Sequence, residues 1–520
     1  MAMSSWGNNL RNIATNLATI VVGIFAGIWF SPYLLNSLGV EAFGLISLSS
    51  NVVLYMSVLT VALNSSVGRH LTVALQRQEW DRMRRIFNTS FWGSIGAGLI
   101  CLLLGGVAAG LIPFWLRVPA GLENQARMIM GAAVIGFCVT TVTATFSSSA
   151  YSRNRIDLVS GTNIVRQLTL IFSVLVFFYW SGKGLDRVAF AIVVASLVST
   201  GWMFHFGRQM ISGLTISPHD FDKNELKRFL TTGSWVTMNQ LGTMLYMNID
   251  LLVANWLFGP KVAGEYATAM LLSNPIRYIS QAVSSVFGPS MTVLYAKGEQ
   301  DRLVMYVRRR IKYMALFNAW PIGLICGFCG PLLGLWLKPQ YRKLAPLVVL
   351  LIIHLSVNLS SSPLFSLFLS LNRVRWPGLV TLATGVSNLV LALVLAGPLG
   401  LGVYGIAGAG AITLTLRNLF AVPLYSGRVL GVSGKSFIAE CLKGGAAAII
   451  LACIGLLLNQ FLPVKNLLIL IGMSVLLSVA YWGVVLGFLL SFAERAELLG
   501  RFRKFFPSGW IGFTQEADFE

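Results

Sequence analysis

The chain is poor in charged residues, and the charge it carries is mostly of one sign. Only 11% of its 520 residues are Asp, Glu, Lys or Arg, whereas soluble proteins carry about 25%. Acidic residues are the scarcer kind, with 19 against 39 basic residues and a net charge of +20. Because 56% of the residues are hydrophobic, this composition excludes an ordinary soluble protein.

Cysteine and histidine are also sparse, with six and four residues. Cys326 and Cys329 form a C-x-x-C pair, but no second pair accompanies it. Buried cysteine usually behaves as a small hydrophobic side chain. We therefore expect no metal site and no cofactor.

What the chain has in abundance is long apolar runs. A helix needs ~20 apolar residues to cross a bilayer, and about fourteen runs of this kind occur. The alternating apolar and polar pattern of a membrane β-barrel is absent. The sequence therefore predicts an all-α polytopic membrane protein with about fourteen transmembrane helices.

A set of residues at the ends of these runs returns about 220 residues further along. Five positions match without a gap, namely Gly39, Gly44, Glu79, Asp81 and Arg82 with Gly259, Gly264, Glu299, Asp301 and Arg302. Residues 115–117 (WLR) return at 336–338 (WLK), and residues 154–155 (NR) return at 372–373. Two related halves built from membrane spans are a common layout of transporters. We therefore predict two pseudo-symmetric six-helix bundles followed by an additional helix pair.

The spacing of the runs divides the chain into five parts. They are an N-terminal bundle (1–207), a linker (208–232), a C-terminal bundle (233–426), a helix pair (427–493) and a basic tail (494–520). In the linker, Asp222 precedes the pattern of an N-capped amphipathic helix at a membrane surface. In the tail, basic residues alternate with aromatic ones, which indicates anchoring beside anionic lipid.

Basic residues are concentrated in alternate loops. Most of the 39 lie in the two ends and in the loops near Arg82, Arg153, Lys227, Arg309, Arg373 and Lys435. The positive-inside rule then predicts that both termini are cytoplasmic. The same distribution accounts for the net charge, so we expect no nucleic-acid partner.

Charged side chains inside a membrane are costly and therefore point to function. Asp250 is the only acid deep inside a predicted span, and Asn239 and Tyr246 lie on the same helix face. In the next span, Arg277 and Gln281 share a face. Two adjacent polar stripes predict a wet cavity, although Asp250 could equally pair with an arginine and hold helices together.

Other spans add candidate binding residues. They are Arg166, Arg417, His354, Asn358, Asn51 and Tyr55. Arginine suits phosphate, which it binds through two parallel hydrogen bonds, while amides and hydroxyls suit sugars. Arg166 and Arg417 could instead reach a membrane surface with their long side chains. We expect the cavity to be cationic, with these residues and the two stripes as its substrate-binding groups.

Residues 250–259 (DLLVANWLFG), continuing to Val262, Gly264, Tyr266 and Ala269, resemble the signature of a known family. It is the polysaccharide-exporter branch of the multidrug/oligosaccharidyl-lipid/polysaccharide (MOP) exporter superfamily, which contains the O-antigen-type flippases. Residues 38–44 (LGVEAFG) resemble the first-half partner of this signature, and residues 221–227 (FDKNELK) resemble its lead-in.

The resemblance implies a V of two six-helix bundles, with a central cavity that alternates between the membrane faces. The cargo would be a polyprenyl-pyrophosphate oligosaccharide, such as one on undecaprenyl pyrophosphate. It would move from the cytoplasmic to the periplasmic leaflet of the bacterial inner membrane, for lipopolysaccharide (O-antigen) or exopolysaccharide assembly. The protein would be no enzyme, and its partners would be the lipid-linked oligosaccharide and membrane lipids. The pathway's polymerase and chain-length components are candidate protein partners.

Three alternatives remain open at this stage. A cation-coupled multidrug exporter of the same superfamily usually has twelve spans and acidic cation-handling residues. The lipid II flippases carry arginines in their first two helices, where this chain has Asn51 and Tyr55. A polysaccharide polymerase or ligase would present a large periplasmic loop, whereas every predicted outward loop here is short.

Overall fold

The structure is a computed structural model that describes residues 2–210, 215–373, 375–492 and 494–495. Within these ranges all regular secondary structure is helical. The first half contains α1 (Ala2–Phe25), η1 (Ala26–Phe30), α2 (Ser31–Leu38), α3 (Val40–Gln76), α4 (Trp80–Gly110), α5 (Ile112–Trp115), α6 (Glu123–Val142), α7 (Ala144–Ser152), α8 (Ile156–Ser181) and α9 (Leu185–Gln209).

The second half begins after a short turn, η2 (Pro218–Asp220). It contains α10 (Lys223–Phe258), α11 (Pro260–Met270), α12 (Ser273–Ser285), α13 (Gly288–Ala296), α14 (Gln300–Gly327), α15 (Cys329–Trp336), η3 (Pro339–Leu344), α16 (Ala345–Ile353), α17 (Leu355–Asn358), η4 (Leu359–Ser361), α18 (Ser362–Ser370), α19 (Arg375–Ala396), α20 (Gly402–Thr415), η5 (Leu416–Ala421) and α21 (Val422–Leu430). The chain continues with α22 (Lys435–Phe461), α23 (Leu467–Val484) and η6 (Val485–Leu489).

Twelve helices in the described residues are long and apolar enough to span a membrane, and the bent pair of α14 and α15 raises the number to thirteen. The protein is therefore a multi-pass helical membrane protein, as the sequence predicts. The remaining predicted run, around Ile279, is divided into α11, α12 and α13. Pro260, Pro275 and Pro289 lie in the first turns of these helices, where proline is tolerated, and they favour short segments over one long helix.

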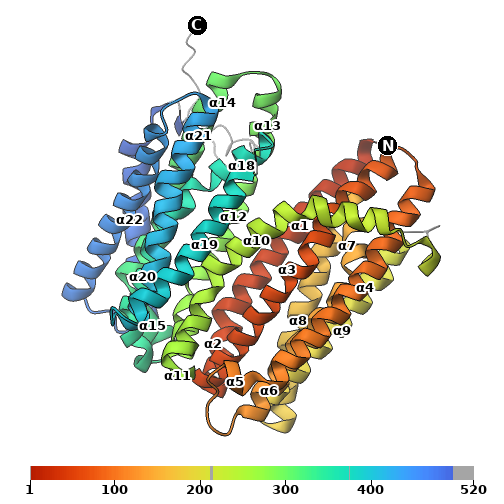
Figure 1. The fold of residues 1–520 in the computed structure, drawn as a ribbon. Coiled ribbons are helices and arrows are strands. Elements are labelled where there is room, and N and C mark those ends of the chain that lie inside the picture. Colours follow the sequence, from red (N-terminus) through yellow and green to blue (C-terminus); the bar gives the residue numbers. More distant parts are fainter. Residues whose placement is uncertain (1, 211–214, 374, 493, 496–520) are drawn as a thin grey trace.

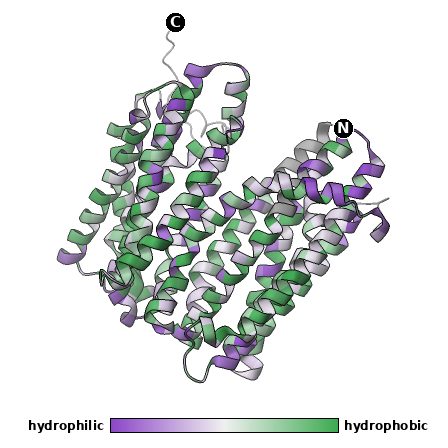
Figure 2. Cartoon of the chain, in the orientation of Figure 1, coloured by the Kyte–Doolittle hydropathy of each residue, from purple (hydrophilic) through white to green (hydrophobic). Residues whose placement is uncertain are grey.

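The helices form two bundles that diverge as a V (Figure 1). The bundles come together where α2, α5 and α11 lie, which we call the closed end. They separate towards the opposite end, where α1, α10 and α14 begin, and we call this the open end. Figure 2 shows hydrophobic residues across the middle of both bundles and hydrophilic residues gathered at both ends, as expected for a membrane-spanning protein.

The sequence repeat is also a structural repeat. Gly39 and Gly259 each separate two helices, and their φ angles are +89° and +87°, a region that favours glycine. Asn154 and Asn372 both have positive φ, at 56° and 53°. Glu79 precedes α4 and binds Arg82 at 3.0 Å. In the second copy, Glu299 precedes α14 and binds Arg302 at 2.9 Å.

The two halves are tied together at the closed end by the repeated tryptophan corners, which are residues 115–117 and 336–338. The side-chain amide of Asn255 accepts a hydrogen bond from the backbone N–H of Arg117 at 2.9 Å and donates one to its carbonyl at 3.0 Å. Trp256 donates to the carbonyl of Trp115 at 2.9 Å. From the second half, Trp336 donates to the carbonyl of Ile28 at 2.7 Å. Each corner therefore contacts the opposite half.

Helix α10 connects the bundles, since it packs against both α3 and α19. Asp222 caps its start by accepting a hydrogen bond from the N–H of Asn224 at 2.8 Å, as the sequence predicts. The amphipathic stretch that follows is the first part of this 36-residue helix, which runs on into the membrane span without a break.

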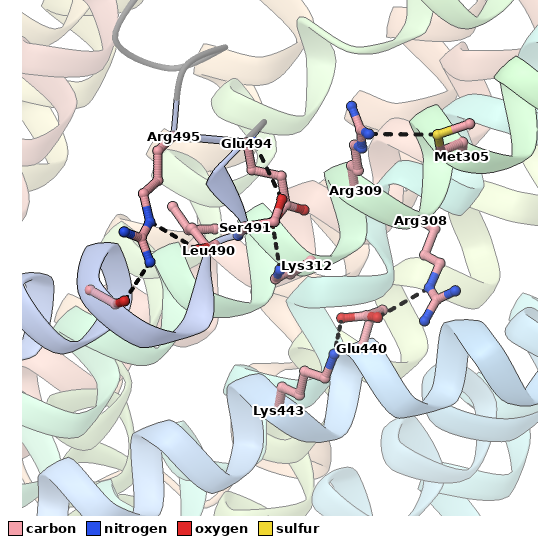
Figure 3. Close-up of polar contacts among 11 residues, drawn as sticks. Met305, Arg308, Arg309, Lys312, Glu440, Lys443, Leu490, Ser491, Glu494 and Arg495 are labelled. Carbon is pink, nitrogen blue, oxygen red and sulfur yellow. Dashed lines mark hydrogen bonds and ion pairs between the residues drawn. The ribbon is translucent and has the colours of Figure 1, made fainter.

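The helix pair α22 and α23 packs on the C-terminal bundle, with α22 alongside α14. Ion pairs hold its ends to α14 (Figure 3). Glu440 binds Arg308 at 3.1 Å and Lys443 at 2.8 Å. Beyond η6, Glu494 binds Lys312 at 2.7 Å and accepts a hydrogen bond from the N–H of Ser491 at 2.8 Å. The predicted lipid-anchoring tail lies, from residue 496 onward, outside the described residues.

Candidate functional site

The two predicted polar stripes meet at a small cavity inside the C-terminal bundle. Its volume is about 20 Å³, enough for about one water molecule. Four of the predicted residues line it, namely Tyr246, Asp250, Arg277 and His354. They come from α10, α12 and the turn between α16 and α17, so three segments far apart in the sequence supply one polar site.

Asp250 is held in place by two neutral donors. Tyr266 on α11 donates to Oδ2 at 3.0 Å, and Asn388 on α19 donates to Oδ1 at 3.1 Å. Asp250 is 7% exposed and Tyr266 is fully buried. No ion pair within 4.0 Å joins Asp250 to a described residue. Its carboxyl group is thus fixed by hydrogen bonds rather than by an arginine.

Arg277 lines the same cavity and interacts electrostatically with Asp250, but from beyond the distance of an ion pair. Among the described residues it makes no hydrogen bond and no ion pair. Arginine carries five N–H donors that are always charged. A guanidinium whose N–H donors have no acceptor among the described residues, inside a membrane-spanning bundle, is therefore available to an anion.

Arg417 and Asn358 lie beside this cavity, each in contact with one of its lining residues. Arg417, in η5, stacks over the ring of Tyr246 at 5.2 Å and donates to Thr381 at 2.6 Å. Its Nε has no hydrogen-bond partner in the described part of the chain. The amide of Asn358 lies 2.7 Å from Nδ1 of His354.

Arg166 and Gln281 lie at a second, larger hollow. It has a volume of about 790 Å³ and is formed by α1 and α8 of the first half and α12 of the second. Leu17, Ile20 and Ile24 supply an apolar wall from α1. Arg166, like Arg277, makes no hydrogen bond or ion pair to any residue that the structure describes. The hollow lies between the two bundles, and it has an apolar wall on α1 as well as polar side chains on α8 and α12.

Three predicted residues lie elsewhere. Asn51 and Tyr55, on α3, donate to the backbone carbonyls of Asn248 and Met244 on α10, at 3.5 Å and 3.4 Å. They thus join the two halves, because α3 and α10 belong to different halves. Asn239 is exposed on α10 and lines neither of these two spaces.

Sequence reasoning did not assign the two residues that hold Asp250. Tyr266 belongs to the motif that resembles the family signature. Its hydroxyl group is buried, and it is not part of a row of polar residues along one helix face that would mark it as a site residue. Asn388 is an isolated amide in the apolar run of α19, and a buried amide in such a run is a signal that can be sought. Which carboxylate it meets depends on how α19 packs on α10.

Comparison with known proteins agrees with this architecture. Residues 10–294 match the family described as "Polysaccharide biosynthesis protein". The uncharacterized membrane protein EpsK of Bacillus subtilis (strain 168) is 31% identical over 495 residues, which are 95% of this chain and 98% of that protein.

Two solved structures share the fold. One is the lipid II flippase MurJ in an inward closed conformation, with a TM-score of 0.68 and 13% identity over 93% of this chain and all of that one. The other is an inward-facing multidrug transporter of the MATE family, with a TM-score of 0.63 and 14% identity over 88% of this chain and 99% of that one. At these identities the likeness is one of fold. The extent of the sequence matches places this chain in the polysaccharide biosynthesis protein family.

Proposed function

We propose that the protein is a flippase for a lipid-linked oligosaccharide. It moves the sugar and pyrophosphate head of a polyprenyl-pyrophosphate carrier from the cytoplasmic to the outer leaflet of the bacterial inner membrane by alternating access. The transported material serves the assembly of a surface polysaccharide. The V opens towards the end where α1 begins, and the charge distribution of the loops supports a cytoplasmic position for this end.

The observation that carries this proposal is a pair of arginines, one in each half, whose guanidinium groups make no hydrogen bond and no ion pair within 4.0 Å to the described residues. Arg277 lines the cavity of the C-terminal bundle, and Arg166 lines the hollow between α1, α8 and α12. An arginine kept inside a membrane for structure alone would be expected to bind a carboxylate or a carbonyl. A pyrophosphate is the anion that such guanidinium groups bind best, through paired charge-assisted hydrogen bonds.

The membrane potential supports the proposed direction. Moving one elementary charge through 100 mV changes the free energy by about 2.3 kcal/mol. A head group with two negative charges leaving an inside-negative cell therefore gains about 4.6 kcal/mol per 100 mV. The bonds of the cargo stay intact, so transport of this kind needs no catalytic group.

The experiment is complementation of a deletion strain. Surface polymer and lipid-linked repeat units are measured in cells without the protein, with wild type, and with Arg277→Ala or Arg277→Lys at matched membrane levels. We expect Arg277→Ala to lower export at least about tenfold, with repeat units accumulating on the cytoplasmic face. Arg277→Lys should retain part of the activity, because the charge remains but the two-pronged geometry is lost.

Arg302→Ala is the matched control, because this arginine is exposed and forms its ion pair with the neighbouring Glu299. It should export normally. Normal polymer in the deletion strain, together with lower resistance to cationic drugs, would replace the flippase with a drug exporter of the same superfamily.

A further inference from the structure

A third hollow lies in the N-terminal bundle. It shares Asn163 and Arg166 with the hollow between α1, α8 and α12 and is otherwise separate from the site described above. Its volume is about 860 Å³, and residues of α3, α6, α7, α8 and α9 line it. This is within the size range of sites that bind organic ligands. Ten of the eighteen lining residues that the structure describes carry a hydroxyl group, and the charged groups among these eighteen are Arg69 and Arg166.

The hydroxyl groups present acceptors to this hollow. Thr72, Thr140 and Thr162 each donate to a backbone carbonyl of their own helix, at 2.8 to 2.9 Å. A hydroxyl that donates to its own helix still has lone pairs with which it can accept. Such a wall can accept hydrogen bonds from the many hydroxyl groups of a sugar.

Four lining side chains supply donors that the protein does not use. Arg69, Tyr151, Asn163 and Arg166 make no hydrogen bond or ion pair to any described residue. A surface with acceptors along its threonines and unused donors at these four positions matches a carbohydrate, whose hydroxyls both donate and accept. An apolar drug would leave most of these groups without partners, which is costly.

Arg166 and Asn163 connect this hollow to the one between α1, α8 and α12, since both residues line both spaces. A molecule with a polar head and a lipid tail can therefore extend from the hydroxyl-lined hollow past Arg166 to the apolar wall of α1. The anion between head and tail would then lie at Arg166.

We propose that the hydroxyl-lined hollow binds the glycan of the cargo, and that Arg166 binds the phosphate group next to it. The inference rests on the proposed function and assigns the sugar to the N-terminal bundle. Thr140 and Thr162 are then specificity residues, because their acceptor oxygens contact the sugar.

The test is ligand binding to the purified full chain in detergent, measured by calorimetry. One probe is the glycan released by mild acid from the lipid-linked unit that accumulates in the deletion strain, and the other is inorganic pyrophosphate. The variants are Thr140→Val with Thr162→Val, Arg166→Ala, and the control Thr384→Val. Thr384 is buried, donates to its own helix at 2.7 Å and lines none of the three hollows.

We expect the double valine variant to bind the glycan at least about tenfold more weakly and pyrophosphate as wild type does. Unchanged pyrophosphate binding also shows that the variant is folded. Arg166→Ala should bind pyrophosphate more weakly, and Thr384→Val should match wild type for both probes.

Equal glycan affinity in wild type and the double valine variant, or no glycan binding by wild type, would overturn the glycan site and leave the proposed function standing. A deletion strain that accumulates no lipid-linked unit would instead overturn the proposed function, and this inference with it.

Discussion

Gly44 and Gly264, which occupy the same place in the two repeats, pack directly against each other. A Cβ atom added to Gly44 would lie 2.9 Å from Cα of Gly264, and one added to Gly264 would lie 2.1 Å from the carbonyl oxygen of Val40. The two copies of the repeat thus meet at their glycines, between α3 and α11. Only hydrogen at these positions allows the two backbones to approach so closely.

Alanine at either glycine should therefore destabilise the contact between the halves. We expect Gly44→Ala and Gly264→Ala each to cost about 1 to 3 kcal/mol. Gly264→Ala should cost more, because its new methyl group would lie 2.1 Å from a backbone atom, against 2.9 Å for Gly44→Ala. Thermal unfolding of the purified protein measures this. Gly106→Ala is the control, since nothing lies within 4 Å of a Cβ there. Equal stability of Gly264→Ala and Gly106→Ala would contradict the packing.

The closed end should open when Asn255 loses its side-chain amide. This buried residue makes two hydrogen bonds to the backbone of Arg117. Asn255→Ala leaves both backbone groups without partners, which costs about 1 to 3 kcal/mol in the closed arrangement. The ratio of molecules with a separated closed end to molecules with a joined one should then rise by a factor of about 5 to 150.

Distances between spin labels at positions 120 and 338, after replacement of the accessible cysteines, measure this opening. Asn466→Ala is a suitable control, because Asn466 caps α23 and contacts neither corner. An unchanged distance distribution in Asn255→Ala would mean that other contacts hold the closed end.

Asp250 and Tyr266 should be energetically coupled. Tyr266→Phe removes the donor to Oδ2 of Asp250 and should destabilise the protein by about 1 to 3 kcal/mol. In an Asp250→Asn background the same change should cost less, giving a coupling energy of at least about 0.5 kcal/mol in a double-mutant cycle of unfolding. Tyr278→Phe, at an exposed tyrosine, should show no coupling. Additive effects of the first pair would contradict the hydrogen bond.

Glu494 should make stability depend on pH. Burial by itself raises the pKa of this carboxyl group, but hydrogen bonds from Lys312 and Ser491 lower the pKa below its usual range. A lowered folded-state pKa means that the stabilisation is complete above the unfolded-state pKa of about 4.3 and is lost as pH falls through the folded-state pKa.

Wild type should therefore lose thermal stability on acidification below about pH 5, whereas Glu494→Gln, already less stable at pH 7, should lose less over the same range. Lys312→Ala should resemble Glu494→Gln, and Lys465→Ala should resemble wild type. If wild type and Glu494→Gln lost stability in parallel as the pH falls, the Glu494 carboxylate would make no contribution to the pH dependence of stability.

Much of the fold is determined by local sequence. Apolar runs of bilayer length specify membrane-spanning helices, and the repeat of Gly39 and Gly44 at Gly259 and Gly264 predicts two related halves. The cap at Asp222 follows from side-chain chemistry within one helical turn. These features need no knowledge of distant contacts.

The site depended on tertiary packing. The sequence brings Tyr246 and Asp250 to one face of a helix, because a helix has a fixed period. It does not say that Asn388 meets Asp250, or that Asn51 contacts the backbone of α10 while Arg277 makes no hydrogen bond or ion pair to the described residues. Those outcomes depend on which helices pack together and at what angle. Close packing is set by small residues distant in sequence, such as Gly44 and Gly264 between α3 and α11, and Gly242 and Gly385 between α10 and α19.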